Sequence, residues 1–586
     1  MEEKMRKTQI LKKLPALLAC ASLLFFGCGD DEEEAEFDLG KNVYHFEGES
    51  LTLSGISGKE IYLAKVNGSL NTDKSPASIV TASCSGLSAS VSPSLSVASS
   101  SSSDTEESLP ARKHYVVSDA EKELAKEFGR LHVQKYGKQS RSALQALYSK
   151  HESDLSVGDE KSIWIQTGSD SNSLDSYEEL DATLRASKTY CNVWVVDSCF
   201  AEETSSGNKV TAAIAEEIAS KFDEIYPRVT NVFGTECDEI LSITVDESTG
   251  NTVSKELVDM ATVKDSEGEL LNDTGTKINI VLCDLEAADY VGYFAPKDYY
   301  NYSVTMGNIA DVSNYGKYFY VDTTSVNDNI KDALLTLAHE FQHMINFNMK
   351  TVQNSATFST FYDEMCSMAC EDMMADYLGV GDDDTPKNRL PLFNKKYTET
   401  GTGEWNSTGN QELYSYSSAY AFGAWLARQY GGAKLFKAIL SNSHSDMDAV
   451  TEAVKSVAGE DYTDEQILER YVQALVFTTS DFTHPTMNQA AKQTLTYGSG
   501  DSAYSYPMTA INLWNLEAAL PTYSSANTNS SYYKYDGPEY LSASDTTALR
   551  PYGFTLHKVG TASADSVTLK LSASPSGSTK YYVLVQ

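Results

Sequence analysis

The chain has 586 residues, 22% of them charged, and a formal net charge of −36 at pH 7. Proteins that bind nucleic acids present basic surfaces to the phosphates, so this acidic balance argues against a nucleic-acid partner. The length allows three or four domains, and the charge fits a soluble protein exported to a surface.

Residues 1–27 have the features of a targeting segment. A basic stretch precedes the apolar run Leu14–Gly27, which is shorter than the roughly 20 residues that a membrane span needs. Cys28 follows this run and precedes acidic residues, which resembles a bacterial lipoprotein box, although Cys20 and ordinary signal-peptide cleavage are alternatives. We therefore expect an exported bacterial protein that is either lipid-anchored through Cys28 at the cell envelope or surface, or secreted.

Residues 28–83 predict a small β-rich domain, because strand-like runs at 51–53 and 61–66 are separated by turn residues. Residues 84–107 are rich in serine and predict a flexible linker. An ordered loop within one domain is the alternative for this segment.

A large domain is expected over residues 108–485, in which strands and helices are mixed. Its first helix is expected at 119–134. A second helix, over 210–225, is expected to end before Pro227, which lacks the amide donor that a helix interior needs. Strands are expected at 162–165, 193–196, 278–282 and 317–322.

Residues 330–345 predict a helix that carries the motif His-Glu-x-x-His. Residues four apart lie one above the other on a helix, so His339 and His343 can bind one metal ion. Glu340 lies beside them, where it can take a proton from a metal-bound water. An apolar stripe lies nearly opposite the histidines and can pack in a core: Ile330, Leu334, Leu337, Phe341, Met344 and Ile345. A chance motif with two surface histidines is the alternative.

A catalytic zinc needs three protein ligands and one open position. The next histidine, His444, lies 101 residues beyond His343 (444 − 343), so a nearby third histidine is absent. A second predicted helix, 361–379, offers Glu364, 21 residues after His343 (364 − 343), as the expected third ligand. Glu371, on the same helix face, is expected to orient a ligating imidazole or to replace Glu364 as ligand. Two solvated surface acids are the alternative.

The remaining sequence returns from helices to strands. Asp382–Asp384 could offer oxygen ligands to calcium, although a solvated acidic loop is the simpler interpretation. A helix is expected at 419–430. Residues 486–586 predict a C-terminal β-sandwich-like domain, in which 566–571 and 581–585 form a hairpin.

Three motifs occur in order along the chain. They are His339-Glu340-Phe341-Gln342-His343, Asp363-Glu364-x-x-Ser367-x-x-x-Glu371-Asp372, and Tyr420-x-Phe422-Gly423-x-Trp425-Leu426. The first two resemble the gluzincin metallopeptidases, and all three resemble more specifically the hyicolysin-type family of bacterial metallopeptidases. The resemblance covers roughly residues 155–480. One departure is Asp363, where gluzincins more commonly have asparagine.

This resemblance implies a thermolysin-like zinc peptidase core with a mixed sheet and a helical lobe. Together with the strands expected at both ends, it predicts a multidomain α+β protein with flanking β domains. An edge strand near the zinc is expected to hold the peptide substrate by main-chain pairing. The resemblance also implies a tyrosine or histidine that donates to the developing oxyanion, for which we select Tyr420 and keep Tyr416, Tyr414 and His444 as alternatives.

The expected function is therefore that of a zinc metallopeptidase with one catalytic Zn²⁺. We expect an endopeptidase that hydrolyses proteins or peptides at the bacterial surface or outside the cell, with contact to the membrane through a lipid anchor. The alternative is a surface-anchored binding or adhesion lipoprotein built on an inactive peptidase scaffold.

Overall fold

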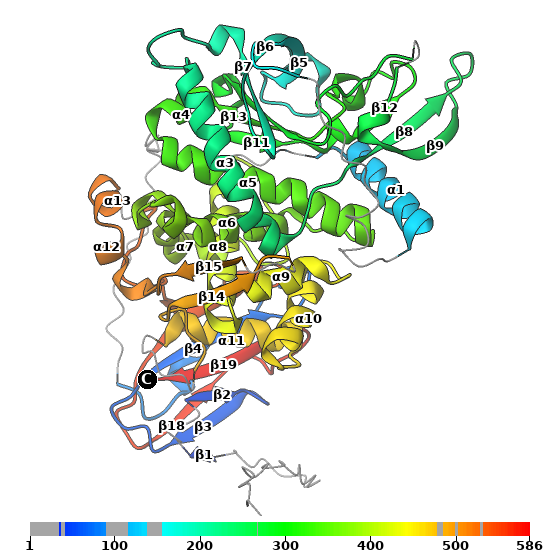
Figure 1. Cartoon of the computed structure of the whole chain (residues 1–586). Coiled ribbons are helices and arrows are strands. Elements are labelled where there is room, and N and C mark those ends of the chain that lie inside the picture. Colours follow the sequence, from blue (N-terminus) through cyan, green and yellow to red (C-terminus); the bar gives the residue numbers. More distant parts are fainter. Residues whose placement is uncertain are drawn as a thin grey trace, which may run out of the picture.

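The structure is a computed structural model of the chain (Figure 1). It describes residues 34–36, 42–88, 115, 117–137, 155–265, 268–477, 484–498, 502–527 and 531–586. The predicted leader at 1–27, Cys28 and residues 89–107 of the predicted linker lie outside the described residues. Of the helices in the described part, none has the length and apolarity that a membrane span requires.

A six-stranded mixed sheet forms the upper part of the molecule in Figure 1, with strand order β11-β13-β10-β7-β6-β5. Its three central strands, β7, β10 and β13, run parallel and are buried along their whole length, as in sheets covered on both faces. The short strand β11 runs antiparallel at one edge. The strands are β5 (Glu160–Gln166), β6 (Tyr177–Ser187), β7 (Cys191–Val196), β10 (Ile278–Cys283), β11 (Gly292–Phe294) and β13 (Tyr318–Asp322). The predicted strands of this region are confirmed.

Helices α3 (Ala212–Phe233) and α5 (Ile330–Asn346) pack against each other beside this sheet. The expectation that α3 ends before Pro227 is wrong, because the helix continues through the proline to Phe233. Its last turn is buried, with Val229 and Val232 almost inaccessible to solvent. Burial of this apolar face therefore outweighs the hydrogen bond that proline cannot make.

A smaller sheet and two helical segments lie beside the end of α5. The sheet has the order β12-β8-β9, and its strands are β8 (Glu239–Val245), β9 (Thr252–Asp259) and β12 (Tyr300–Tyr302). The predicted first helix is confirmed as α1 (Asp119–Tyr136), and a π-helix, η8 (Phe347–Val352), continues α5. A Cβ atom at Gly129 of α1 would lie 2.2 Å from the carbonyl oxygen of Thr351. Glycine is therefore needed for the close approach of α1 to η8.

The lower lobe is mainly helical, and its first helix, α6 (Thr360–Leu378), packs along α5. As predicted, α6 ends at Gly379, which has the left-handed conformation that favours glycine. The helix expected at 419–430 begins earlier, as α8 (Gln411–Tyr430). The other elements are α4 (Thr323–Asp328), α7 (Leu390–Lys396), α9 (Ala433–Ser441), α10 (Asp446–Ala458), α11 (Asp464–Val476), α12 (Leu516–Ala519), α13 (Pro521–Ala526), β14 (Ala491–Thr496) and β15 (Ala503–Met508).

Strands from both ends of the chain form one two-sheet module at the bottom of Figure 1. One sheet has the order β16-β17-β4-β19-β2 and the other β1-β3-β18. Side chains from both ends, such as Leu63 and Val583, share a hydrophobic core. The strands are β1 (Glu34–Glu36), β2 (Val43–His45), β3 (Ser50–Ser54), β4 (Glu60–Asn67), β16 (Leu541–Ser542), β17 (Phe554–Thr561), β18 (Ser566–Lys570) and β19 (Thr579–Val585).

This pairing differs from the expected one in two ways. The ends of the chain do not form two independent β domains, because β4 lies between β17 and β19 in one sheet. The predicted hairpin is also wrong, since β18 pairs with β3 while β19 pairs with β4 and β2 in the other sheet. Local sequence patterns indicate which residues form strands, but the partners are set by the shared core.

His557 on β17 makes this module sensitive to acid. Its side chain is fully buried, and its Nδ1 atom donates to the carbonyl oxygen of Ser542 over 2.7 Å. Burial, and then the positive charge of Lys65, lower the pKa of His557 to about 4. Because the unfolded chain takes up this proton first, stability is lost as the pH falls from about 6.5 towards 4, by up to about 1.4 kcal/mol per pH unit.

We expect the free energy of unfolding, measured by urea denaturation, to fall over this pH range less steeply in His557→Gln than in the wild type. The exposed His444 provides the control, because His444→Gln should keep the wild-type slope. A His557→Gln slope equal to that of the wild type would contradict this account.

Candidate metal centre

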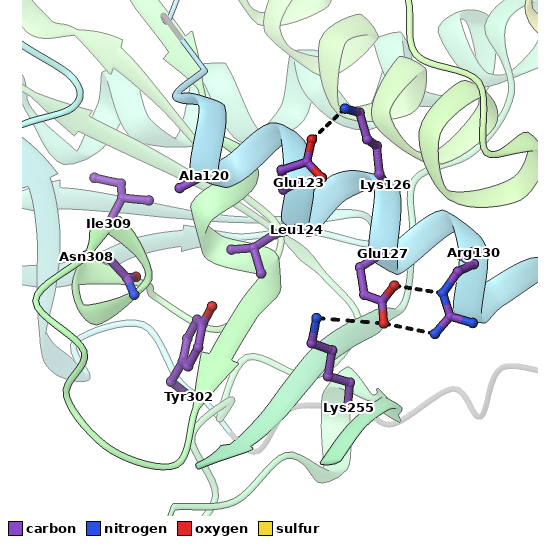
Figure 2. A pocket seen from close by; sticks show the side chains of 10 residues that line it. All are labelled: Ala120, Glu123, Leu124, Lys126, Glu127, Arg130, Lys255, Tyr302, Asn308 and Ile309. Carbon is purple, nitrogen blue, oxygen red and sulfur yellow. Dashed lines mark hydrogen bonds and ion pairs between the residues drawn. The ribbon is translucent and has the colours of Figure 1, made fainter. Parts of the chain in front are cut away.

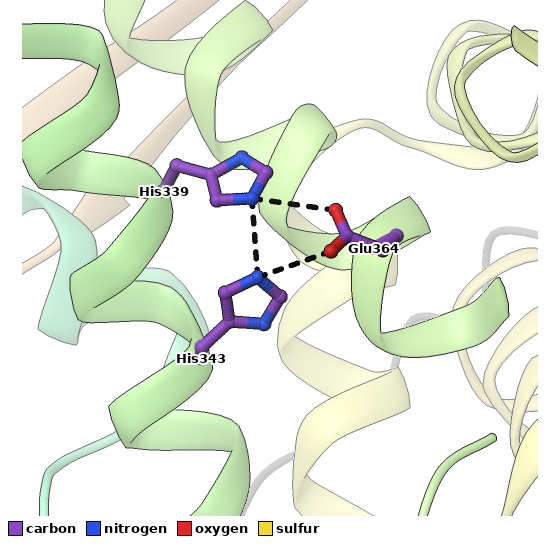
Figure 3. Close-up of side chains that lie close together, drawn as sticks. All are labelled: His339, His343 and Glu364. Carbon is purple, nitrogen blue, oxygen red and sulfur yellow. Dashed lines mark hydrogen bonds and ion pairs between the residues drawn. The ribbon is translucent and has the colours of Figure 1, made fainter. Parts of the chain in front are cut away.

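Helix α5 presents both histidines of the motif on one side. The Nε2 atoms of His339 and His343 lie 3.1 Å apart and face each other (Figure 3). On another side of the helix, the Phe341 ring packs 5.2 Å from the rings of Phe222 and Tyr226 on α3. This packing fixes the rotation of α5, and the predicted division into a core side and a histidine side is confirmed.

Helix α6 brings Glu364 to the same point. Its Oε2 atom lies 3.3 Å from Nε2 of His339, and its Oε1 atom lies 3.5 Å from Nε2 of His343. All three side chains are buried, and one ligand atom from each lies within 4.8 Å of the others. Two nitrogens that each lie 2.0–2.1 Å from a tetrahedral zinc are separated by about 3.3 Å, so this donor set fits such an ion.

A second layer of side chains holds the outer nitrogens of both rings. Nδ1 of His339 lies 2.7 Å from Glu371 Oε1, and Nδ1 of His343 lies 3.0 Å from Asp363 Oδ1 and 3.1 Å from Ser367 Oγ. These contacts leave both Nε2 atoms directed at Glu364. Glu371 has the orienting position that the sequence predicts for it. The contacts of Asp363 and Ser367 were not predicted, although both belong to the second motif.

The carboxylates control the protonation of the two imidazoles. Burial by itself would lower the pKa of His339, but the charges and hydrogen bonds of Glu364 and Glu371 outweigh it and raise the pKa to about 9. Burial opposes the same effect at His343, whose pKa is raised well above its usual value by Asp363 and Glu364. A strong excess of negative charge thus surrounds the point between the three side chains, which favours a cation there.

Glu340 lies next to this group and lines a cavity of about 510 Å³ together with His339, His343 and Glu364. The edge strand β11 passes close to it, because a Cβ atom at Gly292 would lie 3.4 Å from Cγ of Glu340. The glutamate of the motif therefore lies between the expected metal ligands and the edge of the sheet.

The sequence of this region matches known peptidases. Residues 259–531 match the family model described as Peptidase M30. This stretch of the chain resembles the M30 peptidases. It is also 29% identical over 291 residues to the "Neutral metalloprotease ShpI" of Staphylococcus hyicus, an alignment that covers 47% of this chain and 54% of that protein. The chain thus spans about half the length of this relative, and the matched stretch is similar to metallopeptidases, which require a metal.

The structure places the selected Tyr420 and its alternative Tyr416 in different surroundings. The Tyr420 hydroxyl lies 3.4 Å from Asp372, which also pairs with Arg428 at 2.9 Å and with Lys387 at 3.8 Å. The Tyr416 hydroxyl, one helical turn earlier on α8, lies 3.5 Å from Glu364 Oε1. Of the two hydroxyls, only that of Tyr416 lies beside an expected metal ligand, whereas the sequence selects Tyr420.

The remaining alternatives lie elsewhere. His444 is exposed, and the ring of Tyr414 lies 5.3 Å from the ammonium group of Lys396. In the acidic segment 382–384, Asp382 pairs with Lys387 over 2.5 Å. Asp383 accepts hydrogen bonds from the backbone amides of Thr522 and Tyr523. Protein partners thus already occupy two of these three carboxylates.

Proposed function

We propose that this protein is a zinc-dependent endopeptidase with His339, His343 and Glu364 as metal ligands. The observation that carries the proposal is the convergence of these three buried side chains in the lining of a cavity that Glu340 also lines. When bound there, Zn²⁺ would polarise the scissile carbonyl and make water acidic enough to be activated near neutral pH. The complete ligand set gives no support to the alternative of an inactive scaffold.

Two other residues have roles in this proposal. Glu340 accepts a proton from the attacking water and later passes it to the leaving amine. Tyr416 donates a hydrogen bond from its hydroxyl group to the developing oxyanion. Burial, followed by the charge of Glu364, raises the pKa of Tyr416 well above its usual value. The hydroxyl therefore stays protonated and can donate this hydrogen bond.

Strand β11 is the edge strand that fits the substrate-binding role. It lies at the end of the six-stranded sheet, and its backbone passes Glu340 at Gly292. Phe294 at its end lines the 510 Å³ cavity, while Val291 just before it lines a second cavity of about 280 Å³. An extended peptide that pairs with β11 can therefore continue past the metal ligands in both directions, which favours cleavage within a chain.

Elemental analysis of the purified full chain, alongside a digest of casein and of a peptide library, tests the proposal. We expect about one zinc per chain and internal cleavage products that disappear after chelation. Failure to hydrolyse any substrate in the presence of bound zinc would overturn the peptidase proposal and favour a binding protein.

The two tyrosines provide a matched pair of variants. Tyr416→Phe should lower kcat by about 10²–10³-fold, because it removes the proposed oxyanion donor, and keep the metal, because all three proposed ligands remain. Tyr420→Phe should keep kcat and lose about 1 kcal/mol of stability, since it removes a buried hydrogen bond to Asp372. Steady-state kinetics and thermal unfolding measure both effects. The reverse pattern would restore Tyr420 to the catalytic role.

The proposal also includes export, lipid attachment at Cys28 and a thermolysin-like organisation of the core. Mass spectrometry of the amino-terminal peptide from cells that produce the protein tests the first two. A diacylated Cys28 at the new amino terminus would support the anchor, whereas cleavage without lipid would support a secreted protein.

A further inference from the structure

The cavity next to the expected metal ligands is largely apolar away from them. Its volume of about 510 Å³ lies within the range of roughly 300–1,000 Å³ that is usual for ligand sites. Its apolar lining comes from four parts of the chain and includes Val117, Ala125, Phe294, Phe347, Phe358 and Trp405. Burial of an apolar group in a cavity with this lining is favourable, whereas burial of a charged group there is unfavourable.

The charges around the cavity also select against acidic ligands. Four carboxylates line it, from Glu340, Asp363, Glu364 and Asp446, against the single ammonium group of Lys122. Asp446 accepts a hydrogen bond from the backbone amide of Ser359 over 2.8 Å. An acidic side chain in this cavity would therefore meet an excess of like charge.

One wall of the cavity is formed by α1, which precedes the stretch that matches the M30 family. Its position is fixed at both ends. Tyr115 donates to Glu121 over 3.2 Å at the beginning of the helix, and His132 and Tyr136 bind Glu239 of β8 at its end. Between them, Gly129 allows contact with the π-helix, so Ala125 lies at the cavity wall. A larger side chain at Ala125 would thus occupy the cavity itself.

We propose that this cavity binds a large apolar side chain, aromatic or long aliphatic, of the substrate residue that flanks the scissile bond on the His343 side. Ala125 of α1 sets how large that side chain can be. The inference rests on the proposed peptidase function and adds to it the class of substrate. It also assigns a specificity-determining role to a helix outside the family match.

The opposite side of α1 offers a control. A surface groove of about 370 Å³ lies there, and Ala120, Glu127 and Lys255 are among the residues that line it (Figure 2). The groove is crossed by ion pairs of the protein itself, from Glu127 to Arg130 at 2.7 Å and to Lys255 at 3.8 Å. Ala120 is exposed and does not line the metal cavity, so Ala120→Phe adds the same volume to the same helix on the wrong side.

The test compares the zinc-loaded full-length wild type, Ala125→Phe and Ala120→Phe on a peptide library. It then compares them on two peptides that differ only by phenylalanine or glycine at the residue that flanks the scissile bond on the His343 side. We expect the wild type to prefer phenylalanine by roughly 10–100-fold in kcat/KM. Ala125→Phe should reduce this preference at least tenfold, whereas Ala120→Phe should keep it. Phe358→Ala, which enlarges the same cavity, provides a second variant if Ala125→Phe does not fold.

A binding measurement separates this inference from the chemistry. The same two peptides are titrated calorimetrically into the Glu340→Gln protein, with and without Ala125→Phe, and the phenylalanine peptide should bind more tightly only when Ala125 is present. Hydrolysis without an apolar preference, or a preference that neither cavity variant changes, would overturn the inference and leave the peptidase function standing. A wild type that binds zinc but hydrolyses nothing would overturn the proposed function instead.

Discussion

Replacement of Glu340 by glutamine is expected to lower kcat by about 10²–10⁴-fold while the protein keeps its metal. The glutamine has nearly the same shape as the glutamate, so the cavity and the contact with β11 should persist. It cannot accept the proton of the attacking water, and the leaving amine then has no donor. The measurement is kcat on casein and on a defined peptide, with zinc content determined on the same preparation.

The matched control is Glu123→Gln, which makes the same chemical change on the exposed face of α1. This variant should retain wild-type kcat and zinc. Equal activity of Glu340→Gln and the wild type would remove the proposed mechanism. Loss of zinc in Glu340→Gln would instead show that Glu340 contributes to the metal site itself.

Loss of the metal is the expected result of Glu364→Ala. This change removes one of three proposed ligands and leaves two imidazoles that cannot hold the ion alone, so zinc affinity should fall by more than about 100-fold. Glu371→Gln should have a smaller effect of about 10–100-fold, because Glu371 contacts the outer nitrogen of His339 and not the space between the rings. Competition with a chromophoric chelator measures both affinities.

The order of these two effects distinguishes the ligand from the orienting residue. Both glutamates lie on α6 and both are buried, so a nonspecific loss of structure should affect the two variants similarly. A greater loss of zinc in Glu371→Gln than in Glu364→Ala would exchange their roles. Circular dichroism of both proteins controls for unfolding.

The sequence predicted the parts of the site that depend on spacing within one helix. His339, Glu340 and His343 lie on consecutive turns of α5, so their relation follows from helical geometry. The selection of Glu364 over Glu371 also agrees with the position of each carboxylate. The choice between Tyr416 and Tyr420 depends on which turn of α8 lies beside Glu364. Since the two residues share a helix face, only the packing of α8 against α6 separates them.

The dependence on packing between distant parts of the chain also explains the errors in the predicted fold. Strand-like runs located several strands, among them the three central ones of the six-stranded sheet, but a strand carries little information about a partner that is hundreds of residues away. Pro227 is a second case, because the local rule for proline neglects the core that α3 enters. The cavity wall formed by α1 could not be found from motifs, since neither Ala125 nor Gly129 carries chemistry that a motif would mark.

The sheet that joins β4 to β17 and β19 has a consequence for biosynthesis. Asn67 of β4 pairs with Thr579 of β19, so 512 residues (579 − 67) separate two neighbours in one sheet. A ribosome that adds about 5–20 residues per second needs roughly half a minute or more to produce the second partner after the first. During that interval β4 is an unpaired apolar strand that a chaperone must shield or that other chains can capture.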